Sequence, residues 1–447
     1  MPAKPIVHTY AEAFRCTGSA CEDTCCQGWS VPIDQPACQK YQTLPDSPLR
    51  TLIQASILPA PNPRDDAKPP AFATLRMNAA NQCPLLTEDR LCRIHGELGQ
   101  DFLAYSCATY PRIVRTIGGI QEKALALSCP EAARLVLLCP ELPVIACAPP
   151  ADPHCEETDP PGQPQSAPQL WFWPVRNAVL ALLKNRDYPL WQRLFLLSLL
   201  CQRLNSIWNG DLKQSVPNLL RGFAATVAAR TLQPAMDTLP ADDQAQLDVV
   251  LRLAGLLLHR SNITPRFIEC VQWFTAGIGN GPGATLQSLT DNYAAAHNLY
   301  YAPFFARHPY ILENYLTNLV VRLQFPFGRD AMQPGASAAA PPSMIRESVM
   351  LTAQFVLMKG LLIGVAGHHR DSFSAAHVIH TVQAASKHFE HHPEFLQMAY
   401  NLLVESRMDG AQGLSILARN GRPAAPHSSG NGLHALTTHL TTPRLSS

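Results

Sequence analysis

Apolar residues recur at helical spacing over the C-terminal two thirds of this chain. They repeat at intervals of three and four within 247–258, and within 312–323 they follow Pro309, which a first helical turn tolerates. Segment 190–204 is apolar nearly all round, the pattern of a buried helix. A further helix is predicted to begin near Ser343. Alternating strand patterns with Asn-Gly or Asp-Gly turns are scarce, so the sequence predicts a mainly α fold.

Changes in composition divide the chain into four predicted parts. Residues 1–140 are rich in cysteine and are expected to be a loop-rich region that packs on a larger, all-helical domain, residues 171–405. Between them, 141–170 is predicted to be an extended linker, because ten prolines lie within 140–174. Residues 406–447 have few apolar anchors and are predicted to be a largely disordered tail.

Composition and charge narrow the range of partners. The 447 residues are 47% hydrophobic, enough to bury a sizeable core, and 35 Lys and Arg nearly balance 34 Asp and Glu. Without a long basic run the chain lacks the electrostatic footprint of a nucleic-acid binder. It has no apolar run of about 18 residues for a transmembrane segment and no signal-peptide core, which predicts a cytoplasmic protein. The apolar helices leave peripheral membrane association and homo-oligomerisation open.

Eight cysteines are the chemically distinctive feature of the sequence. Disulfide frameworks belong to small secreted domains, whereas thiols in a cytoplasmic protein stay reduced and bind metals. Because thiolate is the preferred soft ligand of zinc and of iron–sulfur clusters, all eight are candidate metal ligands. Their spacing does not decide between one four-thiolate centre and two, and a structural zinc site is an alternative to a cluster. They are Cys16, Cys21, Cys25, Cys26, Cys83, Cys92, Cys107 and Cys129.

Several strings surround these cysteines. They include Cys-Thr-Gly-Ser-Ala-Cys-x-x-x-Cys-Cys-x-Gly-Trp over 16–29, Asn-Gln-Cys-Pro-Leu over 81–85 and Cys-Ala-Thr-Tyr-Pro-Arg over 107–112. Leu-Ser-Cys-Pro-Glu follows over 127–131, and Glu-Asn-Tyr-Leu-x-Asn lies at 313–318 in the helical part. Together these strings resemble the flagellin lysine-N-methylase family. The eight-cysteine spacing is the specific part of this resemblance.

The resemblance implies a cytoplasmic enzyme that methylates lysine side chains of flagellin, with S-adenosylmethionine as the methyl donor. It also implies an oxygen-sensitive [4Fe-4S] cluster whose ligands lie among the eight cysteines. Two other functions fit the sequence, a non-catalytic metal or iron–sulfur binding protein and a helical adaptor for flagellin. The chain lacks the Cys-x3-Cys-x2-Cys triad of radical S-adenosylmethionine enzymes and the glycine-rich turn of Rossmann methyltransferases. A donor site must therefore be built in another way.

One place for the donor is suggested by its charge. A sulfonium cation is favoured over aromatic faces, and the segment 298–305 is dense in aromatic residues. Tyr301 in this segment and Tyr315 beyond it are candidate site residues, and Asn314 and Asn318 share a helical face that can hold polar parts of the donor. Aromatic residues at this density are also typical of a hydrophobic core.

A histidine-rich stretch over 368–392 is a further candidate. Its i, i+3 pairs can chelate a metal, but H-E-x-x-H is absent and a solvated helix face explains the stretch better. Methyl transfer requires a neutral lysine amine in line with the S–CH3 bond, so the site must remove a proton from the lysine. His377 is a candidate for that base.

Overall fold

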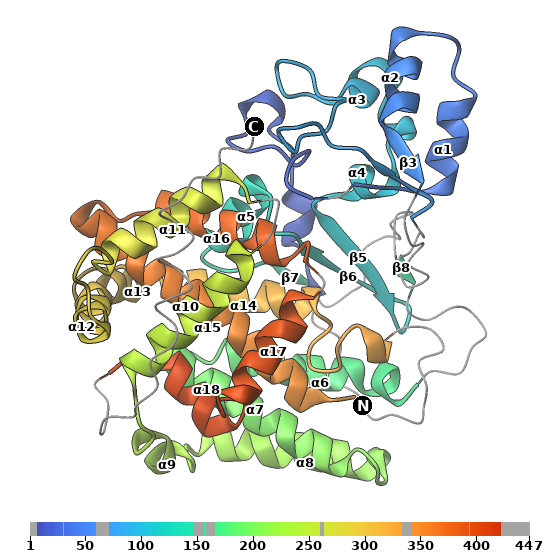
Figure 1. The fold of residues 1–447 in the computed structure, drawn as a ribbon. Coiled ribbons are helices and arrows are strands. Elements are labelled where there is room, and N and C mark those ends of the chain that lie inside the picture. Colours follow the sequence, from blue (N-terminus) through green and yellow to red (C-terminus); the bar gives the residue numbers. More distant parts are fainter. Residues whose placement is uncertain are drawn as a thin grey trace.

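The computed structural model describes residues 7–29, 31–59, 71–145, 156–157, 166–259, 263–332, 342–392 and 394–421. Helices dominate these residues, which confirms the predicted mainly α fold. Figure 1 shows a large helical body with a smaller lobe of short helices and strands at one end.

The helical body is built from residues after 166. Its elements are α6 (Ala167–Leu183), α7 (Leu190–Ile207), α8 (Leu212–Ala228), α9 (Gln233–Asp237), α10 (Asp243–Leu258), α11 (Pro265–Gly277), α12 (Leu286–Ala296), a π-helical turn (His297–Tyr301), α13 (Ala302–Arg307), α14 (Tyr310–Arg322), α15 (Met344–His369), α16 (Ala375–Phe389), α17 (Phe395–Glu405) and α18 (Ala411–Ala418).

The predicted helix starts are confirmed. The Asp242 side chain accepts a hydrogen bond from Ala245 N at 3.0 Å and caps α10. Pro309 and Ser343 occupy the N-cap positions of α14 and α15. The apolar segment 190–204 lies within α7, which packs against α15.

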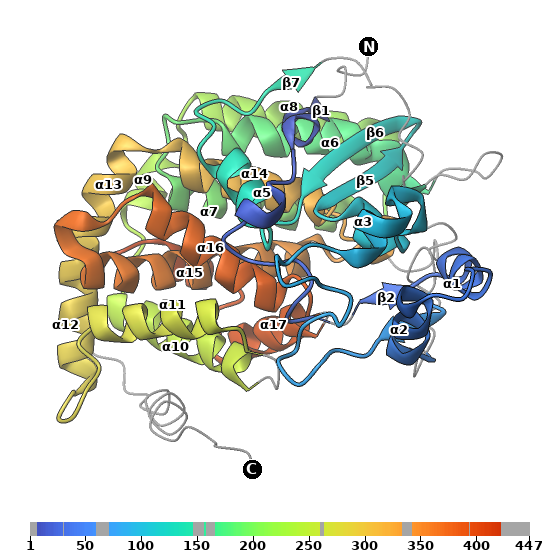
Figure 2. The same cartoon turned by 90° about the horizontal axis from the view of Figure 1, so that it is seen from above.

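Helix α15 runs through the middle of the body, with α7, α10, α11, α16 and α17 around it (Figure 2). Its residues 348–366 are all buried. The contact between α11 and α15 requires glycine, because a Cβ on Gly277 would lie only 1.8 Å from the carbonyl oxygen of Gly364. This close approach lets the backbones of the two helices pack directly.

Helix α15 also bears on the membrane question. Among the described residues, the segment Met344–Ser372 alone is long and apolar enough to cross a bilayer, but its apolar window is completely buried inside the structure. Core helices of globular proteins have the same length and composition.

A β-hairpin lies between the lobe and the body. Strands β5 (Arg112–Ile117) and β6 (Ile120–Leu125) pair antiparallel, joined by Gly118 and Gly119 at φ +60° and +72°. Positive φ at both turn positions matches the twist of a two-residue hairpin, and glycine adopts it without strain. Strand β6 packs on α14, and the short β8 (Glu156–Glu157) extends the sheet beside β5.

The lobe has its own hydrophobic core. It contains the short helices α1 (Gln35–Gln42), α2 (Pro48–Ser56), α3 (Arg93–Leu98) and α4 (Tyr105–Thr109), with strands β2 (Pro32–Ile33), β3 (Ile57–Pro59) and β4 (Ala73–Leu75) forming a small sheet in the order β2-β4-β3. The buried members of this second core all fall between Val31 and Ala104.

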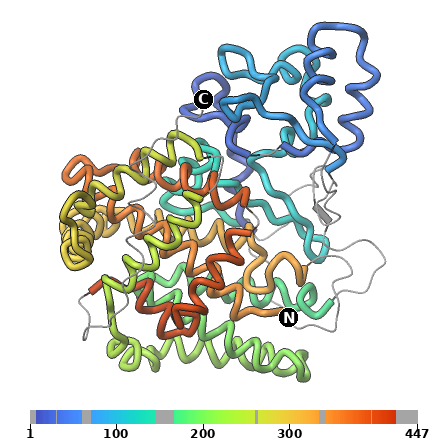
Figure 3. The backbone as a smooth tube through the Cα atoms, viewed as in Figure 1, coloured from blue at the N-terminus to red at the C-terminus, as the bar shows by residue number. Residues whose placement is uncertain are grey.

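These two cores place the domain boundaries differently from the prediction. Strand β1 (Val7–His8), the hairpin and α5 (Pro130–Leu137) contribute to the core of the helical body, so the predicted 1–140 unit is divided between body and lobe. The backbone trace shows the hairpin joining the two parts (Figure 3). Most of the predicted 141–170 linker lies outside the described residues, although β7 (Val144–Ile145) pairs with β1.

The predicted tail also needs correction. Helix α18 lies inside 406–447, and its Leu414 and Leu417 are buried against the body. Beyond it, Gly421 N donates to Asp243 Oδ1 at 3.1 Å. The prediction of disorder is therefore wrong for 406–421, because a few apolar residues suffice when a helix packs into an existing core. Residues 422–447 lie outside the described part.

The buried Lys359 of α15 predicts how stability depends on pH. Its Nζ donates to the carbonyl oxygen of Ala418 at 2.6 Å, and burial lowers its pKa from 10.5 to about 7, although the charge of Asp243 acts in the opposite direction. Between these values the unfolded chain binds more protons than the folded chain, so this group makes the free energy of unfolding rise with pH, by at most about 1.4 kcal/mol per pH unit.

We expect Lys359→Met to flatten this slope between pH 7 and 10, measured by urea denaturation at several pH values. Lys184→Met, at an exposed lysine, is the control and should keep the slope. An unchanged slope in Lys359→Met would contradict a neutral buried lysine.

Candidate functional site

All eight predicted ligand cysteines line one cavity of about 540 Å³. Cys16, Cys21, Cys25 and Cys26 come from the irregular segment that leads from β1 into the lobe. The other four are supplied by elements further along the chain: Cys83 and Cys92 flank a short loop of the lobe, Cys107 lies in α4, and Cys129 is the N-cap of α5. The structure thus brings together thiols that are up to 113 residues apart in sequence.

The second core separates these thiols into two sets. Cys83 is buried in that core, and Cys26, Cys92 and Cys107 pack against it. The backbone joins two of them, since Cys83 N donates to the carbonyl oxygen of Cys26 at 2.8 Å. We call these four the inner set. The outer set is Cys16, Cys21, Cys25 and Cys129, of which Cys129 belongs to the core of the helical body.

Burial makes most of these thiols poor acids. It raises the pKa of Cys83 to about 11, and it raises that of Cys107 to about 12 with further contributions from Cys92 and Cys25. The pKa of Cys129 is likewise raised by burial to about 12. A metal centre that binds these sulfurs must therefore displace their protons.

Cys25 behaves in the opposite way. Its Sγ lies 3.9 Å from that of Cys26, and a hydrogen bond from Cys26 lowers the pKa of Cys25 to about 7, helped by the positive charge of Lys387. The pKa of Cys26 is raised by the same contact. The contact therefore favours a thiolate on Cys25 over one on Cys26.

The donor set of the cavity is compatible with an iron–sulfur cluster. Within the described residues, no three His, Cys, Asp or Glu side chains have donor atoms placed to hold one metal ion. An iron–sulfur cluster takes each thiolate on a different iron atom and so accepts a wider spacing than the tetrahedron of a single zinc ion, whose bonds to sulfur are about 2.3 Å. Asp23 and His95 line the cavity beside the eight thiols.

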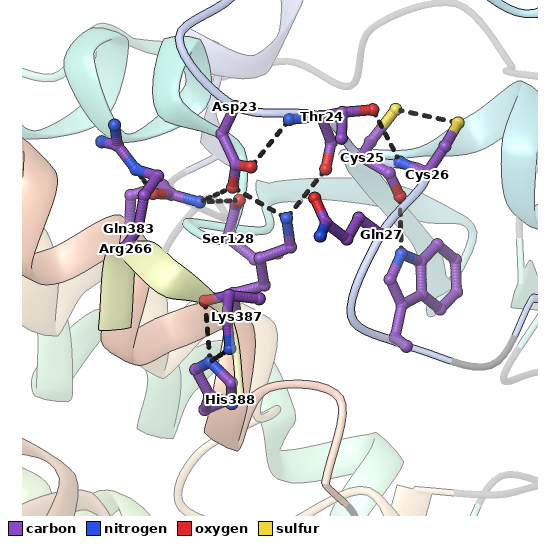
Figure 4. A network of polar contacts seen from close by, with 12 residues as sticks. Asp23, Thr24, Cys25, Cys26, Gln27, Ser128, Arg266, Gln383, Lys387 and His388 are labelled. Carbon is purple, nitrogen blue, oxygen red and sulfur yellow. Dashed lines mark hydrogen bonds and ion pairs between the residues drawn. The ribbon is translucent and has the colours of Figure 1, made fainter. Parts of the chain in front are cut away.

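The helical body reaches this cavity through a buried polar network (Figure 4). Lys387 of α16 donates from Nζ to Asp23 Oδ2 at 2.7 Å and to the carbonyl oxygen of Thr24 at 2.8 Å. Gln383, one turn earlier, donates to Asp23 Oδ2 at 2.7 Å and to the carbonyl oxygen of Ser128 at 3.0 Å. These contacts fix the backbone immediately before Cys25 and immediately before Cys129.

A glycine permits this close approach. Gly28 has φ +86°, and a Cβ there would lie 2.9 Å from Thr264 Cγ2 and 3.5 Å from Lys387 Cε. The cysteine-bearing segment therefore lies directly against the start of α11 and the end of α16.

Aromatic and hydroxyl side chains form another part of the cavity wall. Trp29 and Tyr110 line it, and Trp29 stacks on His391 at 4.9 Å between ring centroids. The Trp29 Nε1 donates to the carbonyl oxygen of Cys25 at 2.6 Å. Ser128 Oγ lies 3.1 Å from the Tyr110 hydroxyl and 2.9 Å from His391 Nε2. Sequence reasoning did not select these residues, apart from placing His391 in the histidine-rich stretch.

The residues predicted to bind the methyl donor lie away from this cavity, and none of them lines it. Asn318 Oδ1 accepts from the Tyr10 hydroxyl at 2.7 Å and from Leu125 N, and Asn314 Nδ2 donates to the carbonyl oxygens of Val136 and Cys139. Both amides connect α14 to the hairpin and α5.

The two predicted tyrosines are core residues. Tyr315 is completely buried, with its hydroxyl 3.5 Å from the carbonyl oxygen of Gln354. Tyr301 is 5% exposed and packs on Phe305 at 4.4 Å between ring centroids. Their surroundings match the alternative of core packing.

His377 also lies away from the cavity. Its Nδ1 accepts from Ser374 N at 3.1 Å in the capping box of α16, and its ring stacks on His369 at 3.7 Å between centroids. With His368, His380 and Trp273 these residues form a group at the ends of α15 and α16. Burial lowers the pKa of His377, so the ring is mostly neutral at pH 7.

Comparison with known proteins identifies the class. The family model of the FliB lysine N-methylase C-terminal domain matches residues 176–417, more than half of the chain. The Flagellar biosynthetic protein FliU of Salmonella muenchen is 34% identical over 129 residues, 29% of this chain and 73% of that protein. The Lysine-N-methylase of Salmonella typhimurium is 33% identical over 133 residues, 30% of this chain and 32% of that enzyme. No solved structure matches.

These matches place the chain among the protein-lysine N-methyltransferases. It belongs to the FliB lysine N-methylase family. The alignment spans about a third of the length of the Salmonella typhimurium enzyme, so it does not establish the methyl donor, the cofactor or the protein substrate of this chain.

Proposed function

We propose that this protein transfers methyl groups from S-adenosylmethionine to lysine side chains of flagellin in the cytoplasm, and that the reaction depends on a [4Fe-4S] cluster in the cysteine cavity. The observation that carries the proposal is the convergence of eight thiols on one cavity, together with the hydrogen bonds by which α16, an element of the matched methylase domain, holds the cysteine-bearing segment at Asp23 and Thr24. The flagellar name of a relative supports flagellin as the substrate.

The inner set is the best candidate to hold the cluster. Cys26, Cys83, Cys92 and Cys107 share one core, as expected of thiols gathered around a common centre. Bound by all four thiolates, such a cluster would supply a redox couple; an iron site that anchors the methyl donor would require that only three of them bind.

The remaining parts of the cavity suit the transfer itself. The faces of Trp29 and Tyr110 can favour a sulfonium or an ammonium group. In the reaction the lone pair of the lysine nitrogen forms the N–CH3 bond, the S–CH3 bond breaks with its electron pair on sulfur, and one proton leaves the nitrogen. The chain's contribution is to exclude water, align the two reactants and accept that proton.

The test is the intact mass of flagellin co-expressed with this protein. We expect methyl-sized increments on lysines, which are absent when the partner carries both Cys25→Ala and Cys26→Ala. Cys139→Ser removes a half-buried thiol outside the cavity and serves as the matched control, with increments retained. Unchanged flagellin mass with iron-loaded wild-type protein would reject flagellin as the substrate of this methylase.

A further inference from the structure

A continuous chain of hydrogen-bonding side chains leaves the cysteine cavity. It begins at the Tyr110 hydroxyl on the cavity wall, continues 3.1 Å to Ser128 Oγ, and reaches His391 Nε2 after a further 2.9 Å. Ser128 is 2% exposed, whereas His391 is half-buried. The chain thus connects the cavity wall, through a buried hydroxyl, to a half-buried imidazole.

The middle of this chain is rigidly held. Ser128 N donates to Glu390 Oε2 at 3.2 Å, and the Ser128 carbonyl oxygen accepts from Gln383 Nε2 at 3.0 Å. Trp29 stacks on the His391 ring at an interplanar angle of 23°. A hydroxyl group both donates and accepts, so two hydroxyls in series can pass a proton without either becoming charged. Imidazole at the far end is the side chain best suited to accept a proton near neutral pH.

We propose that Tyr110, Ser128 and His391 form a proton relay that serves the substrate lysine, an inference that rests on the proposed function. The ammonium group of the lysine gives one proton to the Tyr110 oxygen as Tyr110 gives its own to Ser128. Ser128 passes its proton to His391 Nε2, and the half-buried imidazolium then gives one proton to solvent. The amine keeps the electron pair of the broken N–H bond and uses it for methyl transfer.

The relay gives the proton a path that does not require a free carboxylate in the cavity. The phenol of Tyr110 donates and accepts through one oxygen, so it can pass the proton on without becoming charged. Asp23, the carboxylate among the lining residues, already accepts from Lys387 and Gln383. The ring centroid of Tyr110 lies 6.2 Å from that of His391, and the adjacent Glu390 lies 3.6 Å from Arg322.

Ser128→Ala breaks the relay at its centre and leaves both ends in place. General-base contributions are typically about 10²- to 10⁴-fold, so we expect kcat at pH 7 to fall by about 100-fold with unchanged KM and iron content. The deficit should shrink toward pH 10, where the lysine amine is deprotonated in bulk solution. His391→Gln keeps a hydrogen bond to Ser128 but accepts no proton, and it should show the same pH-dependent deficit.

The matched control is Thr109→Val. This change also removes one partly buried hydroxyl beside Tyr110, but Thr109 Oγ1 donates to the carbonyl oxygen of Tyr105 within α4. It should retain wild-type kcat. Equal kcat in Ser128→Ala and wild type at every pH, a deficit independent of pH, or a deficit that follows lost iron would each overturn the relay. An inactive wild-type enzyme would instead reject the proposed function, and with it the relay.

Discussion

Replacement of Cys83 by serine is expected to lower the iron and sulfide content of the purified protein by more than about 100-fold and to abolish methylation. Even residues that only support metal ligands typically change affinity by about 10- to 100-fold, so loss of a ligand should exceed that range. Cys83 is buried in the second core and its backbone nitrogen donates to the carbonyl oxygen of Cys26, so the backbone holds it beside another member of the inner set. Iron and sulfide analysis with the visible absorption spectrum, under anaerobic conditions, measures the effect.

The lobe contains a control for the packing of Cys83. Cys38 belongs to the same core and is 6% exposed, against 7% for Cys83, but it does not line the cavity. Cys38→Ser therefore buries the same polar group without removing a ligand. We expect it to retain iron and activity, and equal losses in the two variants would show that Cys83 is structural.

The outer set gives the complementary result. Cys16 is exposed and lies outside the second core, so Cys16→Ser should retain the full iron content if the inner set holds the cluster. Loss of about half of the iron would indicate two centres in place of one.

Local patterns predicted the helical body because they are sufficient to form it. Apolar spacing at three and four residues marks α10 and α14, and this signal acts over one or two turns. The β5–β6 hairpin was missed because only Asn-Gly and Asp-Gly were taken as turn signals. Its turn is Gly118-Gly119, and a glycine pair between apolar runs is also a hairpin signal. The order of 406–421 depends on packing of α18 against α7 and α10, which no local pattern records.

The candidate site was predictable only in its cysteines. Thiols at specific spacing are a strong signal, but their division into inner and outer sets depends on which core each one joins. Ser128 and His391 are 263 residues apart, and neither the 127–131 string nor the histidine-rich stretch indicates that they are in contact. Composition and spacing pointed to four residues of the helical body as candidates to bind the methyl donor. Their side chains are instead buried or hydrogen-bonded in the structure: Tyr301, Tyr315, Asn314 and Asn318. Composition alone does not distinguish a core from a ligand site.

Lys387→Met should release the cysteine-bearing segment from the helical body. Lys387 is 2% exposed and pairs with Asp23, whose side chain is 11% exposed. Removing one partner of a buried ion pair typically costs about 3–5 kcal/mol, because the remaining charge is left uncompensated. The carbonyl oxygen of Thr24 also loses its donor, so the segment before Cys25 loses two restraints. We expect a lower midpoint of urea denaturation, a lower iron content and a loss of activity.

Two further variants separate charge from position. Asp23→Asn combined with Lys387→Met removes both charges, so it should recover much of the stability that Lys387→Met alone loses. The hydrogen bond from Lys387 to the carbonyl oxygen of Thr24 stays lost, so we expect the iron content to remain low. Lys213→Met removes an exposed lysine of α8 and should behave as wild type. If Lys387→Met kept wild-type stability and iron content, the polar network would not be what holds the cysteine cavity against α16. The double variant is the most informative. A low iron content in a double variant of near wild-type stability would show that the matched methylase domain positions the cysteine centre directly.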